Sequence, residues 1–451
     1  MRVGVYSPLP PQRSGIADYT AELLPVLARH AELALIVDDS RQAGAVRADL
    51  AKAFPIHTAS ALPSLLASNE LDVVLYHLGN NPDYHAGIRR ALLESPGVVM
   101  VHDVVLHHLV LELTLRKGDP DAYVEELRYC CGATGEAAGL RAVAAGVPVD
   151  PWNYPLFERV VDRSLATLVH NRFSRDRILE SRPTARVEVV PLHLSLGGVP
   201  LAAEARGRLG IQPDELILAS FGFVTEAKRP VATLEAFARL RRDHPRARLF
   251  LVGEISPHFD LRSRVRPELF SGVTVTGHLE LEEFLLHMAA CDVAINLRWP
   301  TAGETSAALI RLLGFGKAVV LTNVGSFAEI PDGCCAKVDA DALEGELLFA
   351  ILERLTADQP LRREMGENAR RYAEAHHAIE ASAAGYARVL REVVERRPRP
   401  FVAVPPLARP AASDTRSAVL ARVSAGLVDL GVGEADEPAL AHVASRLAEI
   451  F

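Results

Sequence analysis

No stretch of about 18 consecutive apolar residues, the length that indicates a transmembrane helix, occurs in this sequence. The amino terminus, MRVGVYSPLP, enters a strand-like run at once and lacks the apolar core of a signal peptide. These two absences predict a cytoplasmic protein with no transmembrane segment. Peripheral attachment to a membrane, which requires only a patch of surface residues, stays open as an alternative.

Cysteine and net charge are also scarce. The five cysteines include the vicinal pairs Cys130-Cys131 and Cys334-Cys335, whose spacing fits neither a disulfide framework nor a zinc site. We therefore expect reduced, structural thiols. The 49 Lys and Arg against 57 Asp and Glu give a formal net charge of −8, without the basic excess that nucleic acid attracts. Any anionic ligand must be bound by a few local groups.

The 451 residues, 49% of them hydrophobic, are enough for two or more domains. Short β-branched runs alternate with amphipathic helical segments, a pattern that predicts parallel sheets covered by helices. The predicted strands form two series, residues 3–7, 33–39, 71–78, 97–103, 166–171 and 187–194, and then residues 216–223, 247–254, 273–279, 292–298 and 318–324.

We therefore predict an α/β protein with two Rossmann-like domains, residues 1–195 and 196–375. A long helical pattern follows over residues 376–398, and residues 399–451 begin with a proline-rich strap and end in a helical tail. Two doubly wound domains that face each other predict a ligand cleft between the carboxyl ends of their strands.

The first candidate site is Gly15, at a strand-to-helix junction. A glycine lets the backbone approach a ligand, and a helix amino terminus offers free N–H groups to an anion. Contact with a phosphate or a sugar is one interpretation. The alternative is that Gly15 only permits the turn.

Polar residues follow two further strands of the first domain. His102 stands at a strand's carboxyl end, where an imidazole could bind a sugar hydroxyl or relay a proton; a purely structural histidine is the alternative. The preceding loop contains His77, Asn80, Asn81 and His85, a polar density that suits a hydroxyl-rich ligand. A turn built by asparagine and proline also explains part of that loop.

Two loops of the second domain carry stronger signals. Lys228 and Arg229 place positive charge beside a helix amino terminus, which opposes the helix dipole unless an anion lies between them. This predicts a diphosphate, with a solvated charge pair as the alternative. Farther along, the amides of Thr305 and Ser306 could hold a phosphate, and Glu304 could bind sugar hydroxyls or only favour the helix start.

The string Asp339-Ala340-Asp341 matches the Asp-X-Asp motif with which many metal-dependent glycosyltransferases hold a divalent ion. It lies in a loop that opens a helix, where acidic residues favour the first turn. We expect these two carboxylates to cap the helix, and we expect no metal site.

In this order the features resemble the family 4 glycosyltransferases, the large retaining group with the GT-B fold. The resemblance covers roughly residues 1–395. It rests on the segments SGIADYT, VHD, VVPLHLSL, FGFVTEAKRPVATLEAFARL, LFLVGE, VTVTGHLELEEFLLHMAACDVAINL, GETS to GKAVV, and VGSFAEIPDG.

The resemblance implies roles for these residues. Lys228 would contact the donor diphosphate, Glu304 the donor sugar, and His102 would be the cleft histidine of the first domain. The other donor-binding residues would be Gly15, Phe223, Arg229, Gly277, His278, Leu279, Gly303, Thr305 and Ser306. The first domain would take the acceptor, the second the nucleotide sugar, and the helix at 376–398 would cross back to the first domain.

The sequence also departs from the family pattern. Phe223 stands where an arginine usually follows the glycine of the phosphate loop, so either Arg229 or Arg298 would supply that charge. An ungapped alignment places Gly303 and Arg311 where the family has two glutamates eight residues apart. The acid at the helix start is displaced by one position.

The predicted function is transfer of a hexosyl group from a nucleotide diphosphate sugar, as co-substrate, to a sugar, lipid-linked or protein acceptor. The resemblance implies front-face transfer with retention and without a metal ion. A nucleotide-sugar epimerase or phosphorylase on the same fold, and a non-catalytic nucleotide-sugar-binding scaffold, are the alternatives.

Overall fold

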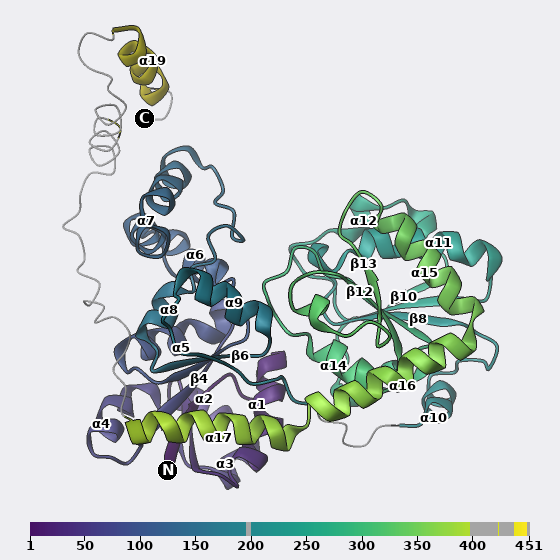
Figure 1. Cartoon of the computed structure of the whole chain (residues 1–451), viewed down its shortest axis with the longest axis horizontal. Coiled ribbons are helices and arrows are strands. Elements are labelled where there is room, and N and C mark those ends of the chain that lie inside the picture. Colours follow the sequence, from purple (N-terminus) through teal and green to yellow (C-terminus); the bar gives the residue numbers. More distant parts are fainter. Residues whose placement is uncertain (195–199, 397–422, 424–436, 449–451) are drawn as a thin grey trace.

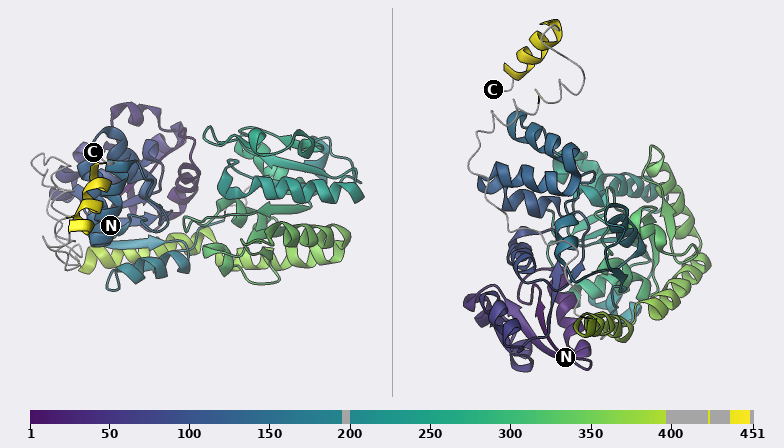
Figure 2. Two further views of the ribbon diagram at one scale, coloured as in Figure 1. Left: turned by 90° about the horizontal axis from the view of Figure 1, so that it is seen from above. Right: turned by 60° about the vertical axis from the view of Figure 1, so that its left-hand side comes forward.

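The computed structural model describes residues 1–194, 200–396, 423 and 437–448. It has two α/β domains that lie side by side, with two long helices running beneath both (Figure 1; Figure 2). The predicted domain boundary at residue 195 and the predicted strap from residue 399 lie outside the described residues. Within them, no helix is both long and apolar enough to cross a membrane.

The first domain contains a seven-stranded sheet in the order β3-β2-β1-β4-β5-β6-β7, and every pair of neighbours is parallel. Its strands are β1 (Arg2–Tyr6), β2 (Glu32–Val37), β3 (Ile56–Thr58), β4 (Val73–Leu78), β5 (Val98–Val101), β6 (Ala166–Val169) and β7 (Val187–Val189). Its helices are α1 (Gly15–Leu27), α2 (Ser40–Ala45), α3 (Ala48–Ala53), η1 (Ala59–Ala61), α4 (Leu62–Ala67), α5 (Pro82–Glu94), α6 (His107–Leu113), η2 (Leu115–Lys117), α7 (Pro120–Ala145), α8 (Glu158–Arg163) and α9 (Arg172–Ser181).

The second domain contains a six-stranded parallel sheet in the order β10-β9-β8-β11-β12-β13. Its strands are β8 (Ile217–Phe221), β9 (Arg248–Val252), β10 (Val273–Val275), β11 (Val293–Asn296), β12 (Ala318–Thr322) and β13 (Ala336–Val338). Its helices are α10 (Ala202–Arg208), η3 (Glu226–Lys228), α11 (Pro230–Asp243), α12 (Leu261–Arg264), η4 (Pro267–Phe270), α13 (Leu281–Ala290), α14 (Ala307–Gly314), η5 (Gly325–Glu329), α15 (Glu344–Ala357) and α16 (Gln359–His376). The chain continues with α17 (Ile379–Arg396) and α19 (Glu437–Ala448).

These sheets confirm the predicted pair of Rossmann-like domains. Strands buried on both faces read as continuous apolar runs, and all six residues of β4 are buried. The sequence analysis missed β3 and β13, two three-residue strands at sheet edges whose residues are mostly half-buried. So short an edge strand carries little hydrophobic signal.

The last long helix returns the chain to the first domain. Helix α16 packs on α14 and β12, whereas α17 packs on α1 and β4 (Figure 1). The hydroxyls of Tyr386 in α17 and Tyr19 in α1 lie 2.8 Å apart, and Ser382 Oγ donates to the carbonyl of Pro191 over 2.7 Å. The chain thus connects its two domains twice.

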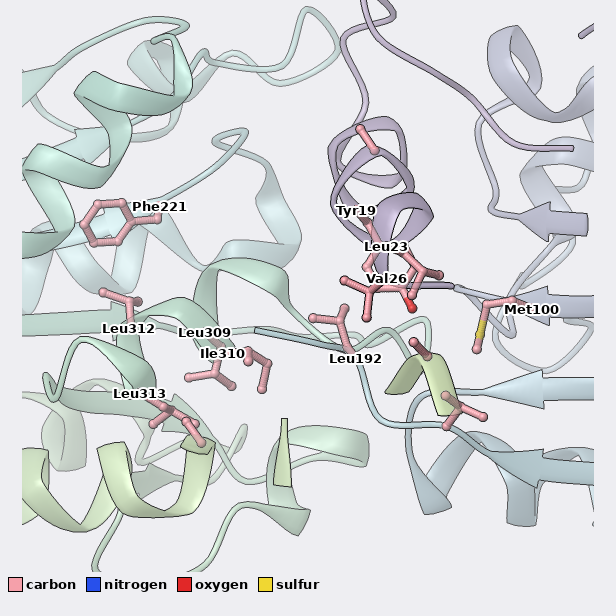
Figure 3. Packing of buried hydrophobic residues seen from close by; sticks show 14 of the residues in the cluster. Tyr19, Leu23, Val26, Met100, Leu192, Phe221, Leu309, Ile310, Leu312 and Leu313 are labelled. Carbon is pink, nitrogen blue, oxygen red and sulfur yellow. The ribbon is translucent and has the colours of Figure 1, made fainter. Parts of the chain in front are cut away.

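One hydrophobic cluster extends through both domains. Figure 3 shows Leu192, just after β7, between Tyr19 and Leu23 of the first domain and Leu309 and Ile310 of α14 in the second. All five side chains are at most 5% exposed. Burial of this apolar surface favours the arrangement in which the two domains lie together.

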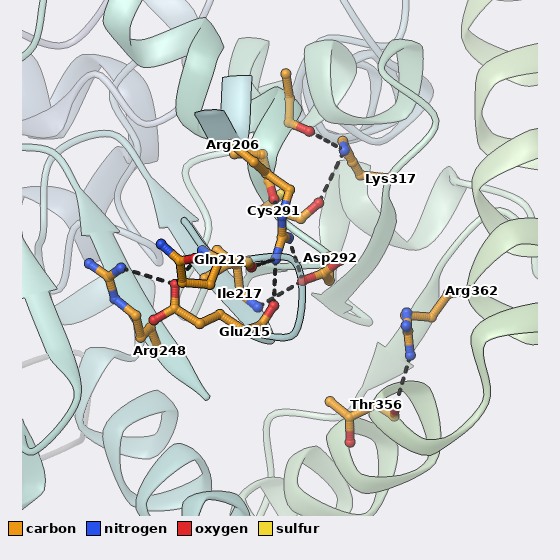
Figure 4. Close-up of polar contacts among 12 residues, drawn as sticks. Arg206, Gln212, Glu215, Ile217, Arg248, Cys291, Asp292, Lys317, Thr356 and Arg362 are labelled. Carbon is orange, nitrogen blue, oxygen red and sulfur yellow. Dashed lines mark hydrogen bonds and ion pairs between the residues drawn. The ribbon is translucent and has the colours of Figure 1, made fainter. Parts of the chain in front are cut away.

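A polar network fixes α10, which begins the second domain (Figure 4). Arg206 donates from Nη2 to the carbonyl of Glu215 over 2.6 Å, and its Nη1 lies 3.2 Å from Asp292 Oδ2. The same carboxylate accepts from the amide of Ile217, the first residue of β8, over 2.8 Å. The helix is therefore held at the amino ends of β8 and β11, opposite the cleft.

Candidate active site

The carboxyl ends of β4 and β5 lie across the domain interface from the loops that follow β8 and β11. Each sheet reverses its strand order there, between β1 and β4 and between β8 and β11. Ligands of doubly wound sheets bind at such switch points. The predicted site residues that lie here are Lys228, Glu304, His77 and His102.

Lys228 lies over the backbone turn that ends β8. Its Nζ donates to the carbonyl of Phe221, and a Cβ added to Gly222 would lie only 2.6 Å from that nitrogen. Gly222 also has φ +82°. The ammonium can occupy this place only because residue 222 has no side chain. The pKa of Lys228 is well below its usual value. Loss of hydration is the main cause, and the charge of the nearby Arg298 is the second.

Glu304 is held by three groups of its own loop. Oε1 lies 2.8 Å from Arg298 Nε, and Oε2 accepts from Thr301 Oγ1 over 2.9 Å and from the amide of Ala302 over 2.8 Å. The helix start is capped instead by Ser306, whose hydroxyl accepts from the amide of Leu309 over 3.2 Å. Glu304 is thus an ion-paired carboxylate in front of the helix.

Asp103, which follows β5, is an acid that sequence reasoning did not select. Its pKa is raised to about 7, mainly by burial and secondly by the charge of Glu304. The amide of Asn80, which donates to Oδ2 over 3.2 Å, opposes this rise. Two carboxyl groups, one from each domain, therefore influence each other across the cleft. An acid directly after a strand was the signal in the sequence.

Three histidines form a hydrogen-bonded row along adjacent strand ends. His77 Nδ1 lies 3.0 Å from His102 Nε2, His102 Nδ1 lies 3.2 Å from His170 Nε2, and His170 Nδ1 lies 2.9 Å from the carbonyl of Val190. Since that carbonyl only accepts, each Nδ1 must donate and each Nε2 within the row must accept. Both ring nitrogens of His102 are therefore occupied, and the buried Nε2 of His77 has no partner.

The remaining first-domain candidates take part in local structure. Asn80 Oδ1 accepts from the amide of Leu109 over 3.0 Å, Asn81 caps α5, and His85 is buried at 1% exposure. Gly15 is the first residue of α1, and a Cβ built there meets nothing within 4 Å. The donor and acceptor roles of these residues stay predictions.

Of the candidate cations, Arg229 pairs with a carboxylate outside the cleft. Its Nε and Nη2 both pair with the buried carboxylate of Glu344. Arg298 instead pairs with Glu304 and lowers the pKa of Lys228, so it is the guanidinium at the cleft. Phe223, where the family pattern has an arginine, is 53% exposed.

The remaining donor candidates lie at strand and helix ends of the second domain. Gly277 has φ +74°, and its carbonyl accepts from Thr276 Oγ1 over 2.9 Å. His278, beside it, is exposed, and Leu279 is partly buried. Arg311, where the pattern has its second glutamate, donates from Nη2 to Glu22 of α1 over 2.8 Å.

The loop that carries Glu304 is fastened to the first domain. Val104 donates its amide to the carbonyl of Ala302 over 2.9 Å, and the carbonyl of Gly303 accepts from Asn171 Nδ2 over 2.9 Å and from Ser174 Oγ over 2.7 Å. Gly303 has φ +79°, and a Cβ there would lie 2.5 Å from Val104 Cγ2. The loop fits between the domains because this residue is glycine.

Metal-ligand groups do not gather in the described part of the chain: no three His, Cys, Asp or Glu residues there are arranged to hold an ion. Asp339 Oδ1 accepts from Asn323 Nδ2 over 2.9 Å, and Asp341 Oδ1 accepts from the amide of Leu343 over 2.8 Å. Asp339 thus bonds to the loop after β12, and the Asp341 carboxylate bonds to the residue before α15. The expectation that both carboxylates cap the helix is wrong, because the N-cap of α15 is Leu343, whose side chain makes no capping bond.

The turn at Gly222 gives a testable prediction. Gly222→Ala should displace the Lys228 ammonium and weaken nucleotide diphosphate binding at least about tenfold, since a hydrogen bond to a charged group contributes about 1.5 to 3 kcal/mol. Gly210→Ala is the matched control, because Gly210 also has positive φ but a Cβ there meets nothing within 4 Å. Isothermal titration should show weaker binding in the first variant alone; equal affinities would contradict the account.

Comparison with known proteins agrees with this geometry. Residues 215–353 match the family model described as Glycosyl transferases group 1. The sucrose-phosphate synthase of Thermosynechococcus elongatus has a similar fold, with a TM-score of 0.61 and 16% identity over 88% of this chain and 100% of that one. WaaG, a glycosyltransferase involved in lipopolysaccharide biosynthesis, has a TM-score of 0.58 and 18% identity over 86% of this chain and 99% of its own.

Anabaena HepE, solved in complex with UDP and glucose, has a TM-score of 0.58 and 14% identity over 87% of this chain and 100% of its own. No protein with a curated description matches the chain. At these identities the solved structures establish the GT-B fold, and the family model adds the activity class.

Proposed function

Because this chain is a group 1 glycosyltransferase with the GT-B fold, which uses a nucleotide sugar donor, we propose that it transfers a hexosyl group with retention of configuration. The observation that carries this proposal is the cluster of Lys228, Arg298 and Glu304 beside the glycine turn after β8. Two cations and a carboxylate at a switch point suit a diphosphate bonded to a hydroxylated sugar.

Lys228 and Arg298 would bind the donor diphosphate. Their charges lie close enough for Arg298 to lower the pKa of Lys228, so an anion between them would relieve that repulsion. Behind it, the amides of Thr305 and Ser306 would add donors at the start of α14. In the part of the chain that is described, these two amides donate to no other group.

Glu304 and Asp103 would hold the sugar. The Glu304 carboxylate is fixed by Arg298 and Thr301, and Asp103 approaches from the other domain. With a pKa raised to about 7, Asp103 can donate a hydrogen bond as well as accept one near neutral pH. His102, whose ring nitrogens are both occupied, would act as a positioning residue for the loop that carries Asp103.

In the proposed reaction the bond between the anomeric carbon and the diphosphate oxygen breaks, and the acceptor oxygen bonds to that carbon from the same face. The acceptor's proton passes to the departing diphosphate, so no protein nucleophile or metal ion is required. The protein stabilises the charge that develops on the leaving group and keeps both substrates together.

Nucleotide binding tests the proposal. Melting temperatures should be measured in EDTA with UDP, GDP, ADP and TDP and their common sugar conjugates, since a ligand of the native state raises stability by mass action. We expect one base to stabilise the wild type and the control Lys52→Ala, an exposed site, but not Lys228→Ala. No shift with any nucleotide at millimolar concentration would contradict the proposal.

Two other outcomes would favour the alternative functions. Net epimerisation of the donor without any acceptor would indicate an epimerase. Donor binding without transfer or hydrolysis, over many acceptors, would indicate a scaffold protein.

A further inference from the structure

The chain's only two tryptophans, Trp152 and Trp299, line one cavity between the domains. The cavity has a volume of about 430 Å³, which is in the range of sites for small molecules. Trp152 belongs to the loop between α7 and α8 of the first domain, and Trp299 to the loop after β11 of the second. The site is therefore complete only when the two domains lie together.

Most of the wall is apolar, and its polar atoms already have partners. Trp152 Nε1 donates to the carbonyl of Thr301 over 3.1 Å. Asp150 accepts from the amide of Trp152 over 3.0 Å and from Asn153 Nδ2 over 2.6 Å, and Thr301 Oγ1 bonds to Glu304. A ligand covered with hydroxyl groups would find few free partners here, whereas a flat apolar ring would bury its faces against indole.

Arg177 is the exception. Its Nη2 donates to the carbonyl of Trp152 over 2.5 Å, which places the guanidinium at the cavity. Within the described residues, no carboxylate forms an ion pair with Arg177. A guanidinium has five N–H donors, so several are left for an anionic group of a ligand.

The cavity shares its wall with the proposed reaction cleft. The amide of Trp299 donates over 2.7 Å to the carbonyl of Ala227, the residue before Lys228. Val104, another lining residue, directly follows Asp103. A molecule in this cavity thus lies beside the groups that would bind the donor diphosphate and sugar.

We propose that this cavity binds the acceptor, and that the acceptor is an aromatic compound that carries a hydroxyl and an anionic group. The ring lies against the faces of Trp152 and Trp299, the anionic group pairs with Arg177, and the hydroxyl points to the donor. This inference rests on the proposed function, because only a glycosyl transferase needs such an acceptor.

The two tryptophans give the test its signal, since they account for all the tryptophan fluorescence of the chain. The probes are 4-hydroxybenzoate, phenol, which lacks the carboxylate, and methyl glucoside, which lacks the aromatic ring. We expect saturable quenching by 4-hydroxybenzoate, at least about tenfold weaker binding of phenol, as expected on loss of one charge-assisted contact, and no response to methyl glucoside. Equal or stronger binding of methyl glucoside, or no response to any probe, would overturn the proposal.

Single substitutions test the contributions of Arg177 and Trp299 to binding separately. Arg177→Gln should remove the preference for 4-hydroxybenzoate over phenol, while Arg175→Gln, on the same helix and paired with Asp176, should keep it. Trp299→Phe, at a side chain 44% exposed, should weaken binding without loss of folding. If both Arg177→Gln and Trp299→Phe bind like the wild type, the probe occupies another site and the proposal is wrong.

Nucleotide binding, measured on the same samples, distinguishes failure of the acceptor proposal from failure of the proposed transferase function. A nucleotide that stabilises the protein while 4-hydroxybenzoate fails to bind would overturn the acceptor proposal and leave the transferase function standing. Binding of 4-hydroxybenzoate without stabilisation by any nucleotide would show that the cavity binds an aromatic anion and would count against the transferase function.

Discussion

Lys228→Ala should lower the kcat/KM for donor turnover by about 10² to 10³-fold, the usual cost of removing one preorganised donor to a developing negative charge. The ammonium lies at the turn of Gly222 and near Arg298, where it would meet the oxygens of the departing diphosphate. Turnover can be followed by the release of nucleoside diphosphate from the donor that binds best.

The same substitution should not destabilise the fold. The pKa of Lys228 is well below its usual value because hydration is lost, so the charged form of this side chain is unfavourable in the folded state. Its loss therefore removes an unfavourable charge as well as a bond to the Phe221 carbonyl. Lys228→Arg should restore part of the activity, and Lys52→Ala should retain all of it. Full activity in Lys228→Ala, with Lys52→Ala as reference, would show that the diphosphate binds elsewhere.

Acidification from pH 6.5 to about 4 should lower the free energy of unfolding steeply. Burial lowers the pKa of His77 to about 3 and of His85 and His170 to about 4, and that of His102 well below its usual value. In this window the unfolded chain binds protons that the folded protein does not, so each such histidine costs about 1 kcal/mol per pH unit as the pH falls.

Two carboxyl groups act in the opposite direction. Burial raises the pKa of Asp103 and of Glu158 to about 7, so each is protonated in the folded protein while its unfolded counterpart is charged. Their contribution falls as pH rises from about 4 to 7. The four histidines outnumber these two groups, and the net stability should therefore rise with pH over this range.

Urea unfolding at several pH values measures this slope. His77→Gln should reduce the slope by about one proton, since that imidazole titrates only in the unfolded chain. His30→Gln, at an exposed site, is the control and should leave the slope unchanged. A flat or falling stability curve between pH 4.5 and 6.5 would mean that the histidine row is not buried as described.

The sequence predicted the architecture because buried parallel strands are apolar over their whole length, as in β4. It also selected His102 at a strand end and His77 in a loop after a strand, but it did not select His170, and the row of three depends on the strand order. Strands β4, β5 and β6 are neighbours in the sheet, so His77, His102 and His170 meet at one edge. Sequence alone left that order open.

Contacts between the domains could not be predicted. Asp103 and Glu304 influence each other only because the loops after β5 and β11 meet, and Trp152 and Trp299 share a cavity for the same reason. No periodicity in the chain encodes which loops of two separate sheets will touch. The charge of Arg229 was also misleading, because its partner Glu344 lies five strands farther along the chain.

The most direct test of the central claim is the configuration of the sugar released from the donor. The preferred nucleotide sugar, identified by binding, should be incubated with the wild type in EDTA and followed by proton NMR before mutarotation. We predict an initial product with the anomeric configuration of the donor, at a rate that falls to background in Lys228→Ala. An inverted product, or equal rates in the two proteins, would contradict retaining transfer at this cleft.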